Sequence, residues 1–336
     1  MKIVKYSKTY KNVLKLQKNY LIDNVNNLKN ELKINNKYIK QKKRKNCKNC
    51  QKILAKPTFK SFGVKYSVCK TCGHLNGINE NTKNFTQQLY INDKGSHYDK
   101  EYSNDFNNRV KNIYLPKVKF LKQVINKKLN LLDIGSGAGH FLKACESVKI
   151  SAKGYEISKY LVDFAKKKLK KNSIEKVSID EMFKILENEN KANVVSLIGV
   201  LEHFYNPEKF LKSFKKSKVD YLYLAVPLFS FSTFLENAFP KVYPRQLSGD
   251  HTHLYTEKSL LYLAKKNNLK IIGEWWFGAD IPDLCRSLIV SSNHLDKKSY
   301  MKEFNKKLYS VMDSLQNVLD QNKICSEVHM IFKKQK

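Results

Sequence analysis

The sequence of 336 residues has no long apolar run, and this absence removes one class of protein. Its longest apolar stretch, Val194 to Leu201, is far shorter than the ~20 residues that a membrane-spanning helix needs. The lysine-rich start also lacks the apolar segment of a secretory signal. We therefore expect a cytoplasmic protein without a transmembrane segment. A content of 42% hydrophobic residues is enough for a sizeable core.

Acidic residues and arginine are also scarce. The 30 Asp and Glu residues stand against 63 Lys and Arg residues, which gives a net charge of +33. A basic surface attracts nucleic acid, but only four of the basic residues are arginine, the side chain that forks onto phosphates and base edges. The lysines are spread along the whole chain beside many Asn and Ile residues. The even spread of lysine indicates a compositional bias of the whole sequence and not a localised basic surface that binds nucleic acid.

Residues 1–46 form a lysine- and asparagine-rich N-terminal segment, with 14 Lys or Arg residues against two acidic ones. Its apolar residues do not repeat at a regular helical spacing. We predict a loosely packed helix or a solvated tail, and the pattern favours the tail.

Four cysteines follow in two matched pairs, Cys47-x2-Cys50 and Cys69-x2-Cys72. Each pair can supply two sulfurs from a tight turn, so together they fit the four ligands of one tetrahedral zinc. Two disulfides or a redox CxxC are the alternatives, but disulfides are rare in a reducing compartment and a redox motif does not explain a matched pair. We predict a structural zinc in a ribbon over residues 47–80, with His74 at the surface or beside the ligands.

A glycine-rich turn is the second strong signal. The apolar run Leu129 to Ile134 ends at Gly135, Gly137 and Gly139, and a helical pattern begins at His140. Glycine allows the backbone of such a turn to adopt angles that side chains forbid and to approach a ligand at the helix N-terminus. The pattern therefore predicts a site for a nucleoside-bearing cofactor.

The spacing of these glycines resembles motif I of the class I S-adenosylmethionine (SAM) methyltransferases. A dinucleotide fingerprint would place Gly or Ala where His140 stands. In the methyltransferase family an acidic residue at the end of the second strand holds the ribose hydroxyls, and Glu156 lies about twenty residues after the turn. The resemblance implies SAM as cofactor, bound by Asp133, Gly135, Ser136, Gly137, Gly139, Glu156, Ile157, Asp180, Gly199 and Leu201.

The chain beyond the turn alternates strands and helices, which predicts an α/β fold with a mostly parallel sheet. The resemblance implies the Rossmann-like, seven-stranded sheet of class I methyltransferases in residues 129–336, preceded by a helical connector, residues 81–128, that covers the cofactor site. Pro116 should kink or divide the connector helix, and Tyr98 and Tyr102 are candidates to reach the site. The expected strands are 129–134, 152–157, 176–179, 193–198, 221–227, 269–277 and 327–332.

The phrase GVLEHFYNPEKFL, residues 199–211, closely resembles the "LEH…P..FL" segment of many SAM methyltransferases. In an open α/β sheet, ligands bind at the carboxyl ends of the strands, so Glu202 and His203 are candidate catalytic residues. A neutral imidazole can take a proton near pH 7, which makes His203 a candidate general base. The alternative is that the Glu-His pair only shapes the pocket wall, as in many relatives.

An aromatic insertion, about residues 228–255, follows the fifth strand and resembles the acceptor side of the same methyltransferases. It ends in DHTHLYTEKSL, where His251 and His253 are the candidates for substrate contact or proton transfer. On an extended segment both rings would share one face, which also suits a metal pair, but no third ligand accompanies them in the sequence. A purely structural role is equally open for His253.

The resemblance favours methyl transfer to a small molecule or glycan, above all a sugar that is nucleotide-linked or within a surface polysaccharide. Trp275 and Trp276, at a strand end, are candidates to stack on a sugar ring, although such pairs also form cores. One alternative is an RNA methyltransferase whose zinc ribbon binds RNA. It is disfavoured because the fourth strand ends in Gly-Val-Leu-Glu and not in the motif typical of amino-group methylation. The other alternative is a non-catalytic SAM-binding subunit.

Overall fold

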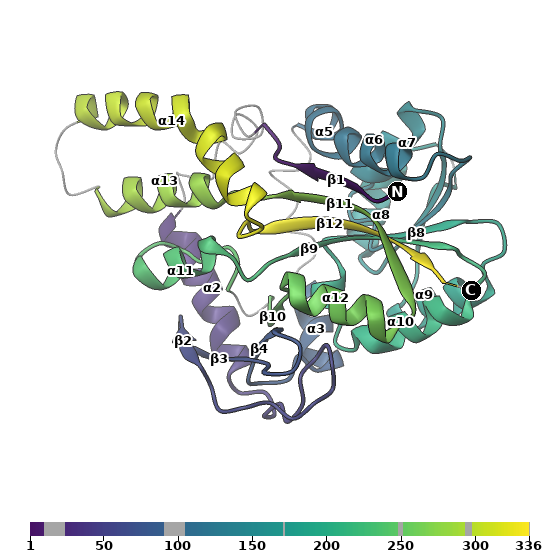
Figure 1. Cartoon of the computed structure of the whole chain (residues 1–336), viewed down its shortest axis with the longest axis horizontal. Coiled ribbons are helices and arrows are strands. Elements are labelled where there is room, and N and C mark those ends of the chain that lie inside the picture. The colour runs from purple at the N-terminus through teal and green to yellow at the C-terminus, as the bar shows by residue number, and fades with distance from the viewer. Residues whose placement is uncertain (10–23, 91–104, 171, 248–250, 293–297, 336) are drawn as a thin grey trace.

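The computed structural model describes residues 1–9, 24–90, 105–170, 172–247, 251–292 and 298–335, and Figure 1 shows their arrangement. Their largest element is an eight-stranded sheet with the order β1-β11-β12-β9-β8-β5-β6-β7. Only β12 runs antiparallel to its neighbours, and the other pairs are parallel. The strands are β1 (Ile3–Tyr6), β5 (Asn130–Ile134), β6 (Ser151–Glu156), β7 (Ile174–Lys176), β8 (Val194–Ile198), β9 (Tyr221–Pro227), β11 (Leu269–Phe277) and β12 (Glu327–Lys334).

Helices cover both faces of this sheet and form a separate core on each (Figure 1). One face packs against α9 (Ile179–Asn188), α10 (Pro207–Lys216) and α12 (Glu257–Lys266). The other packs against the connector, α5 (Phe106–Arg109), η2 (Val110–Tyr114) and α6 (Leu115–Val124), and against α7 (His140–Ser147). The remaining helices are α2 (Asn24–Tyr38), α3 (Lys83–Tyr90), α8 (Lys159–Lys166), α11 (Phe231–Ala238), α13 (Asp280–Ser291) and α14 (Lys298–Gln321).

Local sequence signals fix several helix ends. Asn206 caps α10 by accepting a hydrogen bond from the backbone of Lys209, and Pro207 takes the first helical turn. Thr256 caps α12 in the same way. The connector helix is not interrupted at Pro116: helical turns continue from Phe106 to Val124, and only the hydrogen-bond pattern changes, from π-helical to α-helical at Leu115.

The prediction of a solvated tail for residues 1–46 is wrong where the structure describes them. β1 pairs in parallel with β11 and adds an eighth strand to the seven that the sequence predicts. The Lys5 ammonium lies 4.0 Å from the centre of the Trp275 ring, and the Trp275 indole donates to the Ser7 carbonyl at 2.8 Å. Further along, α2 ends at Tyr38, which is buried. The sequence pattern did not reveal these elements because their many lysines count as polar. Long cationic side chains can nevertheless cover apolar surface while their charge stays in water.

A second sheet joins two segments that are far apart in the sequence. It has the order β10-β4-β3-β2, in which β2 (Phe59–Ser61), β3 (Val64–Val68) and β4 (Leu75–Gly77) come from the cysteine-rich ribbon. β10 (His253–Leu254) comes from the end of the aromatic insertion and pairs antiparallel with β4. The ribbon and the insertion therefore share one sheet and one small core.

The tryptophan pair at the end of β11 belongs to the core. Trp275 and Trp276 are buried, one on each face of the sheet, so neither is available to stack on a sugar ring. Among the described residues, no helix is both long enough and apolar enough to cross a membrane.

Candidate active site

The glycine turn lies between β5 and α7, where the sequence predicts it. Gly135 has φ +71°, and a Cβ at this position would lie 2.7 Å from the Val200 side chain, so the turn has room for glycine only. Gly137 has φ +52° and faces a cavity. Gly139 has φ +81° and is the N-cap of α7. The backbone of the turn can therefore approach a ligand closely at the start of this helix.

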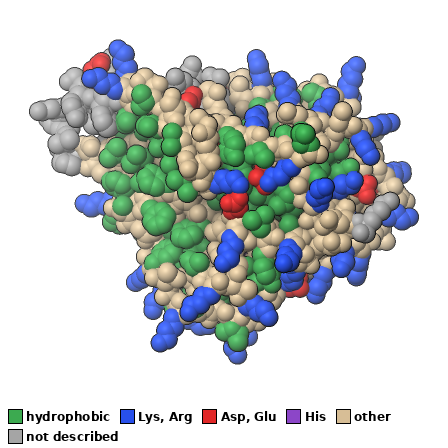
Figure 2. Space-filling model, in the orientation of Figure 1, with side chains coloured by type: hydrophobic (Ala, Val, Ile, Leu, Met, Phe, Trp, Pro, Cys, Tyr) green, Lys and Arg blue, Asp and Glu red, His purple; other side chains and the backbone are tan. Residues whose placement is uncertain are grey.

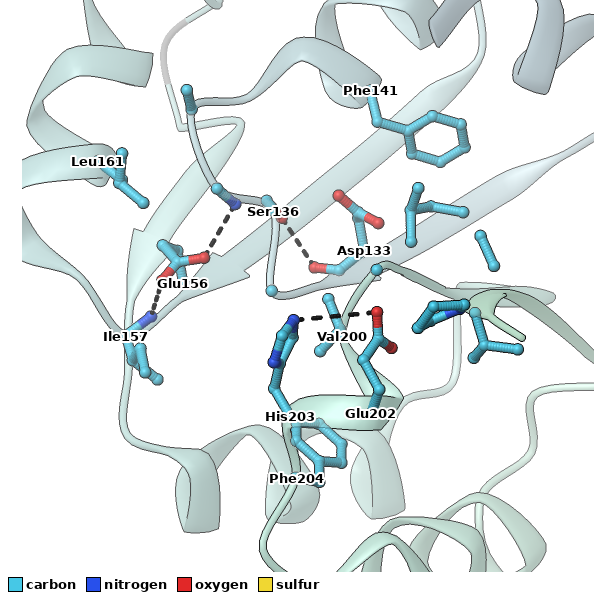
Figure 3. A pocket seen from close by; sticks show the side chains of 18 of the residues that line it. Asp133, Ser136, Phe141, Glu156, Ile157, Leu161, Val200, Glu202, His203 and Phe204 are labelled. Atoms are coloured by element: carbon cyan, nitrogen blue, oxygen red, sulfur yellow. Dashed lines mark hydrogen bonds and ion pairs between the residues drawn. The ribbon is translucent and has the colours of Figure 1, made fainter. Parts of the chain in front are cut away.

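Glu156 closes the turn from the end of β6. One carboxylate oxygen accepts from the backbone N–H of Gly137 at 2.9 Å, and the other accepts from Ile157 at 2.8 Å and Ser158 at 2.9 Å (Figure 3). Burial raises the pKa of Glu156, while these three backbone donors act in the opposite direction. The carboxylate is thus a fixed acceptor at the rim of the cavity.

Asp133, at the end of β5, lines the same cavity. Its carboxylate accepts from the Ser196 hydroxyl at 2.5 Å, and its backbone carbonyl accepts from the Ser136 hydroxyl at 3.0 Å (Figure 3). Burial raises the pKa of Asp133 to about 7, although hydrogen bonds from Ser196 and Ser136 lower it. This carboxyl therefore changes its charge near neutral pH.

The cavity has a volume of about 390 Å³, which is within the range of small-molecule sites. The sequence-predicted residues Asp133, Gly135, Ser136, Gly137, Glu156, Ile157 and Gly199 line one part of it. Apolar walls come from the connector and from α9, through Tyr114, Ile179 and Met182. Polar and charged side chains also line it, namely Lys117, Glu202, His203, Arg245, Gln246, His251 and Glu327.

Glu202, His203 and His251 form a compact cluster among these polar side chains. The first two lie on η3 (Leu201–His203), a short helical turn directly after β8, and His251 precedes β10. Oε1 of Glu202 lies 3.9 Å from Nε2 of His203 (Figure 3), and the rings of His203 and His251 are 5.0 Å apart between centres. One ligand-type atom from each residue lies within 4.8 Å of the other two.

The four cysteines of the ribbon also converge. Cys47 Sγ lies 3.7 Å from Cys72 Sγ, Cys50 Sγ lies 3.5 Å from Cys69 Sγ, and no disulfide joins them. All four sulfurs lie within 4.8 Å of one another. A tetrahedron with Zn–S bonds of about 2.3 Å has edges of about 3.8 Å, so the cluster is compatible with one zinc.

The segment that forms most of this cavity matches a known protein family. The model of the family described as "Methyltransferase domain" matches residues 106–274, half of the chain. The chain belongs to this family. Its activity is SAM-dependent methyl transfer, and the expected α/β fold is confirmed.

Solved structures of methyltransferases resemble this one, at low identity. One is a SAM-dependent methyltransferase from Archaeoglobus fulgidus, with 19% identity, a TM-score of 0.41, and coverage of 66% of this chain and 92% of that chain. Another is magnesium protoporphyrin IX methyltransferase from Synechocystis PCC 6803 with bound SAH, with 11% identity, a TM-score of 0.41, and coverage of 66% and 82%. No curated protein matches this methyltransferase.

Three residues predicted to bind the cofactor, Gly139, Asp180 and Leu201, do not line the cavity of the methyltransferase. Asp180 does not line the cavity, because its carboxylate is held at the surface by Lys83 at 2.8 Å and by Lys209 at 2.6 Å. The predicted third strand ends earlier than expected, at Lys176, since Ser178 already caps α9. Leu201 does not face the cavity either, because its side chain is buried in the hydrophobic core.

The prediction that His251 and His253 share one face is wrong. β10 begins only at His253, so the alternation of a strand does not apply to His251, which lines the cavity. His253 is fully buried behind it, with Nδ1 2.8 Å from Nε2 of His74. Burial lowers the pKa of His253 far below its usual value and that of His74 to about 3, so both rings stay neutral. His74 is therefore not a surface residue.

Sequence reasoning missed the cationic and aromatic side chains of the cavity. Lys117 comes from α6, where it is one lysine among many, and Arg245 comes from the insertion. The sequence has only four arginines, and this rarity was the one signal that could have singled out Arg245 as a cavity residue. Tyr114 of the connector stacks on His140 of α7 with ring centres 5.1 Å apart, and both line the cavity. Tyr98 and Tyr102 lie outside the described residues.

Proposed function

We propose that this methyltransferase transfers the SAM methyl group to a hydroxyl of a small-molecule or glycan acceptor, in particular a sugar. The donor end of the cavity is assigned to the glycine turn, Asp133 and Glu156, with the two Glu156 oxygens facing the ribose hydroxyls. SAM, when bound, supplies an electrophilic methyl on a sulfonium. The residues of this chain position donor and acceptor for in-line displacement.

The acceptor end is assigned to Glu202, His203 and His251. In the simplest form of the reaction, the acceptor oxygen bonds to the methyl carbon, the carbon–sulfur bond breaks, and the acceptor proton passes to the His203 imidazole. Oε1 of Glu202 lies 3.9 Å from Nε2 of that ring. His253 is excluded from this step because it is buried against His74.

The observation that supports a polyhydroxylated acceptor is the number of polar side chains in the cavity lining. Carboxylate, imidazole, guanidinium and amide groups from Glu202, His203, Arg245, Gln246 and His251 all belong to it. Such a set can hydrogen-bond several hydroxyls at once. Because the tryptophans are buried, a sugar would be bound through these polar groups and not by stacking on indole rings.

The zinc ribbon is assigned a structural role. Four cysteine ligands fill the coordination shell of a tetrahedral zinc and leave no open position for chemistry. The ribbon packs on the catalytic domain through Asn49, which donates to the Ser259 carbonyl at 2.9 Å, and through the β4–β10 pairing. Its role in this proposal is to hold the segment that precedes His251 and His253 in place.

Transfer of label from methyl-labelled SAM tests the proposal. Purified protein is incubated separately with nucleotide sugars, with polysaccharide fractions and with total RNA. We expect labelled sugar or glycan, and label in RNA would replace the sugar proposal with the RNA alternative. Figure 2 shows Lys and Arg side chains scattered over the visible face, without the stripe that RNA binding favours. Tight SAM binding without transfer to any fraction would indicate a non-catalytic subunit.

A further inference from the structure

We propose that Glu202, His203 and His251 together bind one divalent transition-metal ion, which coordinates the acceptor hydroxyl. This inference rests on the proposed function and deepens it, because it names the means by which the acceptor is held and activated. The sequence suggested a metal pair at His251 and His253. In the structure His253 is buried and does not belong to the cluster. Glu202 and His203, both on η3, lie beside His251 instead.

The geometry of the cluster is the first reason. Its three ligand-type atoms lie within 4.8 Å of one another, a separation that a single ion with bonds of about 2.0–2.2 Å can bridge with small side-chain rotations. The residues belong to two segments, η3 and the loop before β10, that meet only in the folded chain. Among the described residues, the ribbon cysteines form the one other cluster of this kind.

The position of the cluster is the second reason. Glu202 is only 2% exposed, yet all three residues line the same cavity as the glycine turn and Glu156. A site with three protein ligands leaves coordination positions open, which is typical of catalytic metals and differs from the closed shell of the four cysteines. These open positions would face the space assigned to the acceptor.

The ligand types restrict the metal. Two imidazoles and one carboxylate suit borderline first-row ions such as Mn²⁺, Fe²⁺, Co²⁺ or Zn²⁺ better than Mg²⁺ or Ca²⁺, which prefer oxygen ligands. The thiolates of the ribbon prefer softer ions than Mn²⁺. Mn²⁺ is therefore a probe that distinguishes the cavity cluster from a zinc-filled ribbon.

In this form of the reaction the metal-bound hydroxyl loses its proton to solvent water. The resulting oxygen bonds to the methyl carbon as the carbon–sulfur bond breaks, and S-adenosylhomocysteine leaves. A divalent ion favours this step because it lowers the pKa of a coordinated hydroxyl, as it does for bound water. His203 then acts as a ligand, and the loss of the proton to water replaces the proton transfer to its imidazole described above for the reaction without a metal.

Electron paramagnetic resonance of Mn²⁺ tests the inference on the full-length protein saturated with S-adenosylhomocysteine at pH 7.5, with zinc limited to one equivalent per chain so that the thiolates of the ribbon take it up and the cavity cluster stays open to Mn²⁺. Binding removes the six-line signal of free Mn²⁺. We expect one bound Mn²⁺ per chain and at least tenfold weaker binding in each of Glu202→Gln, His203→Asn and His251→Asn. Asp180→Asn is the matched control, since it removes an acidic charge outside the cavity and should leave Mn²⁺ binding unchanged.

Calorimetry with S-adenosylhomocysteine on the same samples, without Mn²⁺, separates the two proposals. Retained affinity in the three ligand variants shows that they are folded and that the donor end is intact. Absence of Mn²⁺ binding to the wild-type protein, or Mn²⁺ binding that survives all three substitutions, would overturn the metal site. Absence of S-adenosylhomocysteine binding to the wild-type protein would instead refute the assignment of the donor end.

Discussion

Replacing Glu156 by glutamine tests the donor end of the cavity, because the structure separates its effect on stability from its effect on affinity. Glutamine can keep the oxygen that accepts from Ile157 and Ser158. Its amide nitrogen then faces the Gly137 N–H, which loses its acceptor at 2.9 Å. A lost hydrogen bond to a charged group costs about 1.5–3 kcal/mol.

This first loss occurs in the free and in the bound protein alike, so it lowers the free energy of unfolding and leaves the affinity unaffected. The second loss occurs only in the complex, where one ribose hydroxyl no longer meets a carboxylate oxygen. The same range of about 1.5–3 kcal/mol converts to an affinity about 10- to 150-fold lower. We therefore expect Glu156→Gln to lower both the melting temperature and the affinity for S-adenosylhomocysteine.

Calorimetric titration measures the affinity and thermal unfolding measures the stability. Glu175→Gln is the matched control, since Glu175 lies on the neighbouring strand, pairs with Lys153 at 2.6 Å and is exposed. The control should change neither quantity appreciably. An affinity of Glu156→Gln within threefold of the wild-type value, together with a lowered melting temperature, would show that Glu156 only fixes the glycine turn and does not bind the ribose.

Three further predictions concern the ribbon, the core carboxyl and the added strand. Cys69→Ser should abolish stoichiometric zinc, measured by elemental analysis, and lower the melting temperature, whereas Cys285→Ser, at a buried cysteine outside the cluster, should retain the zinc. Native Asp133, with a pKa of about 7, binds its proton more tightly than the unfolded chain does, so its contribution to stability should fall as pH rises from about 4 to about 7, by at most ~1.4 kcal/mol per pH unit. Urea unfolding at both ends of that range should show a smaller fall for Asp133→Asn, and an equal fall would contradict the assigned pKa. Deletion of residues 1–7 removes β1, so the tryptophan emission should shift to longer wavelength as Trp275 loses its cover, and an unchanged spectrum would show that β1 does not protect β11.

The meeting of the glycine turn and Glu156 at the cavity was predictable because these residues lie at or directly after the ends of strands. Gly135, Gly137 and Glu156 follow two adjacent parallel strands, and the rules for such sheets bring those ends together. Asp180 shows the limit of this reasoning. The capping box of α9 ends the expected strand early, and two lysines that are distant in sequence hold the carboxylate at the surface.

The acceptor half was less predictable because long-range packing decides it. His251 and His253 are two residues apart, yet one lines the cavity and the other pairs with His74, which lies 179 residues away from it in the sequence. No local pattern contains that information, since β10 exists only because β4 offers it an edge. β1 was missed for a similar reason: four residues become a strand only beside the exposed edge of β11.

The shared sheet gives the ribbon a physical route to the acceptor site. His74 comes one residue after the turn that follows Cys72, and it meets both His253 and the Ser259 hydroxyl, at 2.8 Å and 3.4 Å. The backbone of Gly77 donates to the Thr252 carbonyl at 2.8 Å, directly between the two histidines of the insertion. A metal bound by the four cysteines would therefore also fix the segment from which His251 reaches the cavity. It follows that loss of zinc should reach the acceptor end through these contacts, while Glu156 and the glycine turn, which belong to β5, β6 and α7, keep their geometry.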